Sequence, residues 1–412
     1  MKKNYIFVEI LNMEFQPTDM NTEHNKIDFN NSEISFKNKS NKELREAYLL
    51  FRVMNNPTLV RMGKHLVNFA FTIHFPVKGI IRNTIYKYFV GGSSIEDCAK
   101  SIEKLKSRNV GTILDYAAEG EQEEAFFNTT CDEVIKTIEY AHTNKSIPFS
   151  VFKITGLGRF DLFVKISQGT MLSEEETKEY ERVENRVKRI FEMGYKNNIP
   201  ILVDAEETWI QPMLDDLVNK NMEIYNKTKA IVQNTYQMYR HDSIERLKEH
   251  HKMALEKNYK FGLKIVRGAY MEKERKRAHQ NNYPSPIQPD KASTDNDFNE
   301  IIKYLIENID TIDFMVATHN EESSELLANL IDKLNLPKNH PSIYFAQLYG
   351  MSDHITNNLA EKGYNVVKYV PYGEVKTMMP YLFRRAEENS SVKGQTSREL
   401  RLIEKELKRR KE

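Results

Sequence analysis

Eight short apolar segments, separated by long amphipathic stretches, follow one another along the chain from residue 109 onward. They cover residues 110–114, 151–154, 200–203, 230–232, 263–266, 314–317, 343–346 and 365–369. Continuous apolar segments indicate strands that are buried on both faces of a parallel sheet, and strands that alternate with helices indicate βαβ units. Eight such units in about 280 residues predict a (β/α)8 barrel. A doubly wound open sheet is the competing fold.

Composition excludes several classes of function. The net charge of the 412-residue chain is +1, so no electrostatic argument favours nucleic acid as a partner. The two cysteines, Cys98 and Cys131, form neither a CxxC motif nor a Cys/His cluster, so no metal site is expected. The start has no presequence pattern and no apolar run is long enough to span a bilayer. We expect a cytoplasmic protein, or one bound peripherally at the inner face of the membrane.

Four regions are predicted along the chain. Residues 1–40 are expected to form a loosely ordered polar arm, 41–108 a helical segment, 109–397 the barrel and 398–412 a charged tail. The tail carries seven basic and four acidic residues, and Leu400, Ile403 and Leu407 give it an apolar stripe. That pattern fits either an interfacial membrane helix or a solvated surface helix.

Polar residues stand where most of the predicted strands end. They are Asp115, Lys153, Asp204, Gln233, Arg267, Thr318, His319, Asn320, Gln347 and Tyr369. The active sites of such barrels lie at the carboxyl ends of the strands, so this pattern predicts one ring of functional groups. Alternatives remain open for single members: Asp204 as a strand end before an acidic helix start, His319 as a turn residue and Gln233 as a strand cap.

Two features point to an anionic ligand. Lys264 lies inside an apolar segment, where its ammonium group needs a partner. Near the end of the chain, Tyr381, Arg384, Arg385 and Glu388 fall at i, i+3, i+4 and i+7 on one helical face. Adjacent guanidinium groups suit a small carboxylate with an apolar body, whereas the alternative is an exposed helix with Arg–Glu pairs.

Together these motifs resemble proline dehydrogenases. The resemblance rests on Asp204-Ala205-Glu206-Glu207, on 264–270, 317–320, 347–351 and 368–373, and on 381–389, and it covers roughly residues 85 to 395 in the order of the family. It implies a distorted (β/α)8 barrel with the last helix over the barrel mouth, preceded here by the helical segment predicted above. It also implies FAD as cofactor, bound without a Rossmann motif.

The resemblance further implies a role for each matching residue. Arg384, Arg385 and Lys153 would bind the proline carboxylate, Glu119 would pair with one of the arginines, and Glu388 would brace their helix. Tyr270, Leu348, Tyr369 and Tyr381 would enclose the ring, with Asp204 bonded to Tyr369. Lys264 would lie beside flavin N5, and the remaining cofactor contacts would be Gln233, Arg267, Gly268, Ala269, Thr318, His319, Asn320 and Gln347.

The implied reaction is oxidation of L-proline to Δ1-pyrroline-5-carboxylate by hydride transfer from C5 to FAD. Membrane quinone would accept the electrons, and a separate pyrroline-5-carboxylate dehydrogenase would act next. Two positions depart from the family: Lys264 stands where many bacterial members have Arg, and Ala117-Ala118 precedes Glu119 where Leu-Gly is common. The alternatives are a hydroxyproline dehydrogenase, which Tyr381 argues against, methylenetetrahydrofolate reductase, and a non-catalytic amino-acid-binding barrel.

Overall fold

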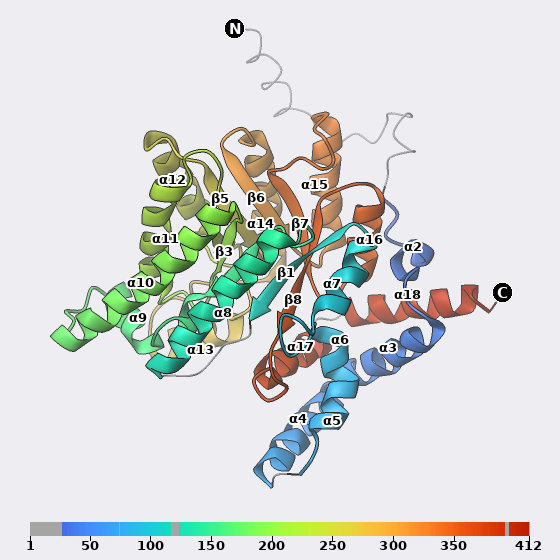
Figure 1. Ribbon diagram of the computed structural model, residues 1–412. Helices are drawn as coiled ribbons and strands as arrows, with labels where there is room; N and C mark the ends of the chain where they lie inside the picture. Colours follow the sequence, from blue (N-terminus) through green and yellow to red (C-terminus); the bar gives the residue numbers. More distant parts are fainter. Residues whose placement is uncertain (1–26, 74, 117–122, 392–394, 412) are drawn as a thin grey trace.

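A parallel barrel forms the body of the chain in the computed structural model, which describes residues 27–73, 75–116, 123–391 and 395–411 (Figure 1). The strands are β1 Val110–Tyr116, β2 Ser150–Lys153, β3 Ile201–Asp204, β4 Val232–Gln237, β5 Phe261–Val266, β6 Ile312–Ala317, β7 Ile343–Leu348 and β8 Val366–Tyr372. Their order is β1-β8-β7-β6-β5-β4-β3-β2, every pairing in this sheet is parallel, and β1 also contacts β2. The prediction of a (β/α)8 barrel is confirmed, because an open doubly wound sheet would not bring β1 beside β8.

Helices connect the strands and cover the outside of the barrel (Figure 1). They are α8 Glu124–Thr143, α9 Phe160–Ser167, α10 Glu174–Asn197, α11 Gln211–Tyr225, α12 Ser243–Glu256, α13 Met271–Gln280, α14 Lys291–Glu307, α15 Glu321–Lys333 and α16 Asp353–Glu361. Side chains that accept backbone N–H groups fix several of their starts, as Ser173 does for α10 and Asp290 for α14. The main apolar core lies between these helices and the outer face of the strands.

The fourth strand departs from its predicted bounds. Its predicted segment ended at Val232, but β4 begins there and runs to Gln237, although five of its six residues are polar or tyrosine. Each polar group is satisfied locally: the Asn234 amide donates to Asp215 Oδ1 (2.8 Å), and Thr235 Oγ1 donates to the carbonyl of Val203 (2.7 Å). A polar segment can therefore form a buried strand, which apolar patterning does not detect.

A second apolar core joins the N-terminal helices to the end of the chain. The helices before the barrel are α2 Ser32–Phe36, α3 Asn41–Met54, α4 Pro57–Thr72, α5 Lys78–Ile81, a π-helical turn at Arg82–Tyr86, α6 Lys87–Phe89 and α7 Ala99–Lys106. The last two are α17 Met379–Ser391 and α18 Gln395–Arg409. Phe51 of α3, Leu382 of α17 and Ile403 of α18 meet in this core.

The apolar stripe of the tail, which left open an interfacial membrane helix or a solvated surface helix, is packed inside the protein. Ile403 is fully buried and α18 lies against α2 and α3, so the apolar stripe is already covered by protein. Glu406 is also buried, and it pairs with Arg409 and Arg410 of the same helix. In the described part of the chain, no helix is both long and apolar enough to cross a bilayer. The arm predicted for residues 1–40 falls largely outside the described residues.

Candidate functional site

The carboxyl ends of the strands gather charged side chains inside the barrel. Lys153 is the last residue of β2 and lies opposite Asp204, the last residue of β3. Because side chains alternate between the two faces of a strand, Lys264 of β5 and Tyr369 of β8 reach the same interior. Four strands therefore contribute to one site at this mouth.

Asp204 is the centre of this charge cluster. Its Oδ2 lies 3.0 Å from Lys153 Nζ and its Oδ1 lies 2.5 Å from Lys264 Nζ, while Lys153 Nζ is also 3.5 Å from Asp115 Oδ2. Burial opposes ionisation of Asp204, but the two ammonium groups outweigh it and lower its pKa to about 2. The carboxylate thus stays charged and holds both lysines in place.

Lys264 links Asp204 to Tyr369. Its ammonium group donates to Tyr369 Oη at 2.7 Å and lies 4.6 Å from the centroid of that ring. The sequence predicted a direct bond between Asp204 and Tyr369; here Lys264 stands between them and bonds to both. Burial lowers the pKa of Lys264 and raises that of Tyr369, so the phenol remains a neutral wall of the site.

The arginine helix α17 follows β8 at the same end of the barrel (Figure 1). Arg385 is buried, forms an ion pair with Glu388 and lies 5.2 Å from the centroid of the Tyr381 ring, while Arg384 is half-buried. Burial raises the pKa of Tyr381 to about 12, with Asp115 among the charges that act on it. Burial also raises the pKa of Glu388, against the effect of Arg385. The charge of Asp115, at the end of β1, thus acts on the Tyr381 ring of α17.

A second group of predicted residues surrounds the start of α15. Arg267 donates from Nε to Asp295 Oδ1 (2.7 Å) and from Nη1 to Thr318 Oγ1 (2.6 Å). Asn320 caps α15 by accepting the N–H of Ser323 (2.8 Å). Burial, with Lys368 and Arg385 nearby, lowers the pKa of His319 well below its usual value, so this ring is neutral.

The structure does not bring Gln347 to the mouth. Its neighbour Leu348 packs against the apolar cluster of the barrel interior, so Gln347 lies on the outer face of β7. Its amide donates to the carbonyl of Thr318 (3.3 Å) and accepts from Thr356 Oγ1 (2.8 Å). We correct its predicted role: Gln347 supports the loop after β6 from behind rather than facing a cofactor.

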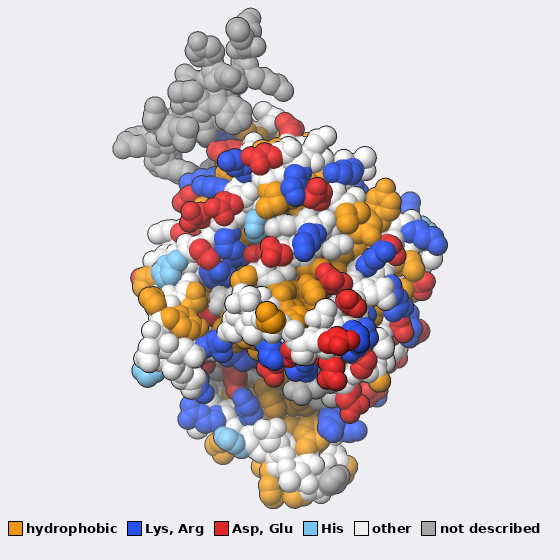
Figure 2. Space-filling model, turned by 90° about the vertical axis from the view of Figure 1, so that its left-hand side faces the viewer, with side chains coloured by type: hydrophobic (Ala, Val, Ile, Leu, Met, Phe, Trp, Pro, Cys, Tyr) orange, Lys and Arg blue, Asp and Glu red, His pale blue; other side chains and the backbone are white. Residues whose placement is uncertain are grey.

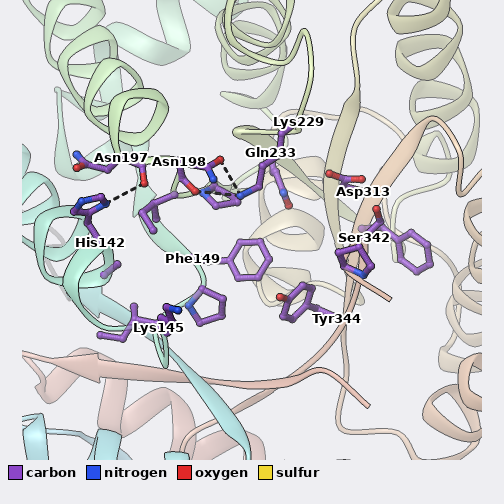
Figure 3. Close-up of a pocket in the computed structure, with 17 residues that line it drawn as sticks. His142, Lys145, Phe149, Asn197, Asn198, Lys229, Gln233, Asp313, Ser342 and Tyr344 are labelled. Carbon is purple, nitrogen blue, oxygen red and sulfur yellow. Dashed lines mark hydrogen bonds between the residues drawn. The ribbon is translucent and has the colours of Figure 1, made fainter. Parts of the chain in front are cut away.

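Gln233 lies at the opposite end of the barrel. The prediction that it follows the fourth strand is wrong, since it is the second residue of β4 and donates to the carbonyl of Ala230 (3.0 Å). It lines a cavity of about 370 Å³. Figure 3 shows it there with Phe149, Asp313 and Tyr344, which stand at or before the amino ends of their strands. A contact between Gln233 and a ligand at the carboxyl mouth is therefore excluded.

Gln237 occupies the position that was predicted for Gln233. The two residues share the inner face of β4 and are four residues apart, which is roughly 13 Å at the usual rise of a strand. Gln237 is buried at the carboxyl end, where its Nε2 donates to the carbonyl of Glu206 (2.7 Å). Extending the predicted strand by four residues along the same face would have identified Gln237.

Glu206 is a further site residue without a predicted role. Its Oε2 accepts from Thr155 Oγ1 (2.7 Å) just beyond the ends of β2 and β3. Burial raises its pKa to about 7, against the hydrogen bond from Thr155. A carboxyl group that titrates near neutrality beside Lys153 is a common property of functional sites.

The other predicted site residues lie on β7, at the start of α13 and in the loop after β5, or outside the described residues. Leu348 pairs with Tyr369 across β7 and β8, and Tyr270 is half-buried at the start of α13. Gly268 has φ +125°, and a Cβ atom there would lie 2.6 Å from the ring of Tyr239, so only glycine fits. Ala269 beside it is exposed. Glu119 lies outside the described residues.

Comparison with known proteins identifies close relatives. The family model for proline dehydrogenase matches residues 98–398. The mitochondrial proline dehydrogenase 1 of Dictyostelium discoideum is 31% identical over 95% of this chain and 76% of its own length. Hydroxyproline dehydrogenase of Xenopus laevis is 29% identical over 91% of this chain and 88% of its own length.

Solved structures agree on the fold. The crystal structure of proline utilization A (PutA) from Bdellovibrio bacteriovorus, inactivated by N-propargylglycine, matches with a TM-score of 0.69 and 23% identity. The match covers 88% of this chain but only 38% of that chain. The present chain therefore corresponds to a part of that larger protein.

Proposed function

The chain belongs to the proline dehydrogenase family, and we propose that it oxidises L-proline to Δ1-pyrroline-5-carboxylate with bound FAD. The observation that carries the proposal is the Lys153–Asp204–Lys264–Tyr369 cluster at the mouth beside the arginine helix, in which Lys264 and Tyr369 are buried. Side chains cannot accept a hydride, so FAD would supply the acceptor, N5, for the hydride from proline C5. Membrane quinone is the proposed final acceptor, and a separate pyrroline-5-carboxylate dehydrogenase the next enzyme.

The residues around α15 fit a flavin dinucleotide. A diphosphate needs cationic and N–H donors, and Arg267 together with the N-terminus of α15 offers both. Thr318, neutral His319 and Asn320 add short polar contacts on the same loop. We assign Lys264 to the neighbourhood of N5 and Gln237, in place of Gln233, to the polar edge of the ring system; Gly268 and Ala269 follow Arg267 in the same loop.

The arginine helix and β2 fit the substrate. Arg384, Arg385 and Lys153 are the proposed partners of the proline carboxylate, since charge-assisted bonds from guanidinium groups fix a small anion in one orientation. Tyr270, Leu348, Tyr369 and Tyr381 are the proposed walls around the ring. The positive charges on these partners also disfavour a protonated amine, and oxidation requires the neutral amine.

Hydroxyproline is the second candidate substrate, because one relative is a hydroxyproline dehydrogenase. The buried Tyr381 ring argues against it, since its bulk leaves little room for a ring hydroxyl. Tyr381→Ser should lower kcat/KM for proline while hydroxyproline is tolerated relatively better. An unchanged ratio of the two kcat/KM values would show that Tyr381 does not set this preference.

Anaerobic addition of L-proline to the purified protein tests the proposal as a whole. We expect a yellow protein whose flavin absorbance is bleached by L-proline without oxygen. A protein that stays colourless and inactive after FAD is supplied would instead be a non-catalytic amino-acid-binding barrel.

A further inference from the structure

Helix α4 exposes a continuous apolar stripe. Leu59, Met62, Leu66, Phe69 and Ile73 have 45%, 62%, 71%, 61% and 54% of their surface exposed. They are spaced alternately three and four residues apart, so they lie along one face of the helix. Contiguous exposed apolar patches mark surfaces that bind a partner or a membrane.

Protein covers the opposite face of the same helix. Val60, Val67 and Phe71 pack against the second apolar core, and Lys64 forms an ion pair with Glu387 of α17 (2.6 Å). The orientation of α4 is thus fixed by its buried side, and the stripe faces outward. Phe75 and Ile80 extend it toward α5, with 57% and 63% of their surface exposed.

The surroundings of the stripe are positively charged. The sequence has six Lys or Arg residues and no Asp or Glu from Ala47 to Ile95. Arg52, Arg61, Lys78 and Arg82 are exposed and make no ion pair with other described residues. In Figure 2 the lower tip of the molecule shows hydrophobic side chains and no acidic ones.

We propose that the outer surface of α4 and α5 docks on an anionic lipid membrane. The apolar stripe would enter the boundary between headgroups and acyl chains, and the surrounding cations would approach the lipid phosphates. Charge complementarity favours this occupant over a second copy of the chain, because two such surfaces would bring the same positive charges together. The helix lies on the bilayer and does not cross it.

The docking surface lies on a helix that packs against the candidate site. Helix α4 contacts α17, which carries Tyr381, Arg384 and Arg385, so the membrane would lie on the far side of one helix layer from the barrel mouth. That placement suits a lipid-soluble electron acceptor, and this consequence rests on the proposed function. Membrane binding itself does not depend on it.

Co-sedimentation of the full chain with vesicles tests the proposal without substrate. The vesicles contain phosphatidylcholine alone or mixed with phosphatidylglycerol. We expect binding to the mixed vesicles, and the triple variant Met62→Gln/Leu66→Gln/Phe69→Gln should bind them about tenfold or more weakly. Arg61→Gln/Lys78→Gln/Arg82→Gln should lose the preference for phosphatidylglycerol.

A matched control changes three other apolar residues that are also at least half exposed. Met171, Ile224 and Leu255 have 93%, 62% and 52% of their surface exposed, and Met171→Gln/Ile224→Gln/Leu255→Gln should bind like the unmodified chain. If the Met62/Leu66/Phe69 variant bound the vesicles as well as this control variant, the proposal would be overturned. The proposal would also be overturned if the unmodified chain did not bind vesicles but formed a dimer in light scattering, and the Met62/Leu66/Phe69 variant were a monomer.

Activity assays separate this proposal from the proposed function. With a soluble dye as acceptor, the α4 variant should turn over proline like the unmodified chain. Vesicle binding by a protein that does not oxidise proline would contradict the proposed function alone.

Discussion

The two mouths of the barrel are built from the same strands but hold different chemistry. At the carboxyl mouth, Asp204 binds two lysines inside the barrel. At the amino mouth, Phe149 and Tyr344 stack edge to face beside a cavity of about 370 Å³, and Asp313 makes no ion pair with the described residues (Figure 3). Burying charge is costly, so its concentration at one mouth favours that end as the one that acts on a ligand in the proposed function.

The largest expected effect follows from removing the charge at the centre of the cluster. Asp204→Asn leaves the ammonium groups of Lys153 and Lys264 without their common carboxylate, and breaking a buried pair in this way costs about 3–5 kcal/mol. We expect the free energy of unfolding, measured in urea, to fall by that amount. Asp313→Asn at the amino mouth is the control and should change it by less than about 1 kcal/mol. Equal losses would mean that the mouths do not differ.

Substrate binding should depend on the same mouth. Arg385→Met removes a charged donor from a partly desolvated site. The variant should lose about 2–4 kcal/mol of the transition-state stabilisation that kcat/KM for proline measures, mainly through a higher KM. Arg384→Met should act in the same direction, and the flavin content should stay normal. Lys145→Met, which changes a residue that lines the cavity at the amino mouth, should leave kcat/KM and KM for proline unchanged. A near-normal KM in both arginine variants would place the substrate elsewhere.

The buried carboxyl group of Glu206 should make stability depend on pH. Because burial raises its pKa to about 7 from 4.5, the folded chain keeps a proton that the unfolded chain loses, and stability falls as pH rises through this interval. Glu206→Gln removes that loss, worth up to roughly 3 kcal/mol above neutral pH. Urea unfolding at about pH 5 and about pH 8 should show a smaller difference in the variant. An unaltered pH dependence would contradict the buried, protonated state.

Apolar patterning was sufficient to predict the barrel but not the environment of each residue. All eight predicted segments overlap strands, because strands buried on both faces must be apolar. In β4 the buried polar groups bond to Asp215 of α11 and to neighbouring backbone, and the sequence alone does not reveal such partners. Gln347 adjoins the mouth in sequence, but strand alternation turns it outward.

The two amphipathic helices show a second limit. The stripe of α18 and the stripe of α4 have the same helical periodicity, yet Ile403 is fully buried while Leu66 is 71% exposed. Periodicity predicts that a helix has an apolar face, and tertiary packing decides what covers that face. The stripe of α18 therefore cannot serve as the membrane contact that its pattern allowed, whereas the fold leaves the stripe of α4 uncovered.

The smallest predicted effect compares two glutamines on one strand. Gln237 and Gln233 share the inner face of β4, and each donates its amide to a backbone carbonyl, at 2.7 Å to Glu206 and at 3.0 Å to Ala230. Replacing either by Leu removes one buried hydrogen bond, so both variants should lose similar stability, about 1 kcal/mol.

The two glutamines differ in the end of the barrel that they face. The affinity for FAD should therefore distinguish the two variants. Gln237→Leu should weaken FAD binding by about 1 kcal/mol, or roughly fivefold in Kd, measured by flavin fluorescence on reconstitution of the apoprotein. Gln233→Leu should bind FAD with unchanged affinity, because its amide lies at the amino mouth. If Gln233→Leu weakened FAD binding as much as Gln237→Leu, the cofactor would not be confined to the carboxyl mouth, and the functional contrast between the two ends of the barrel would fail.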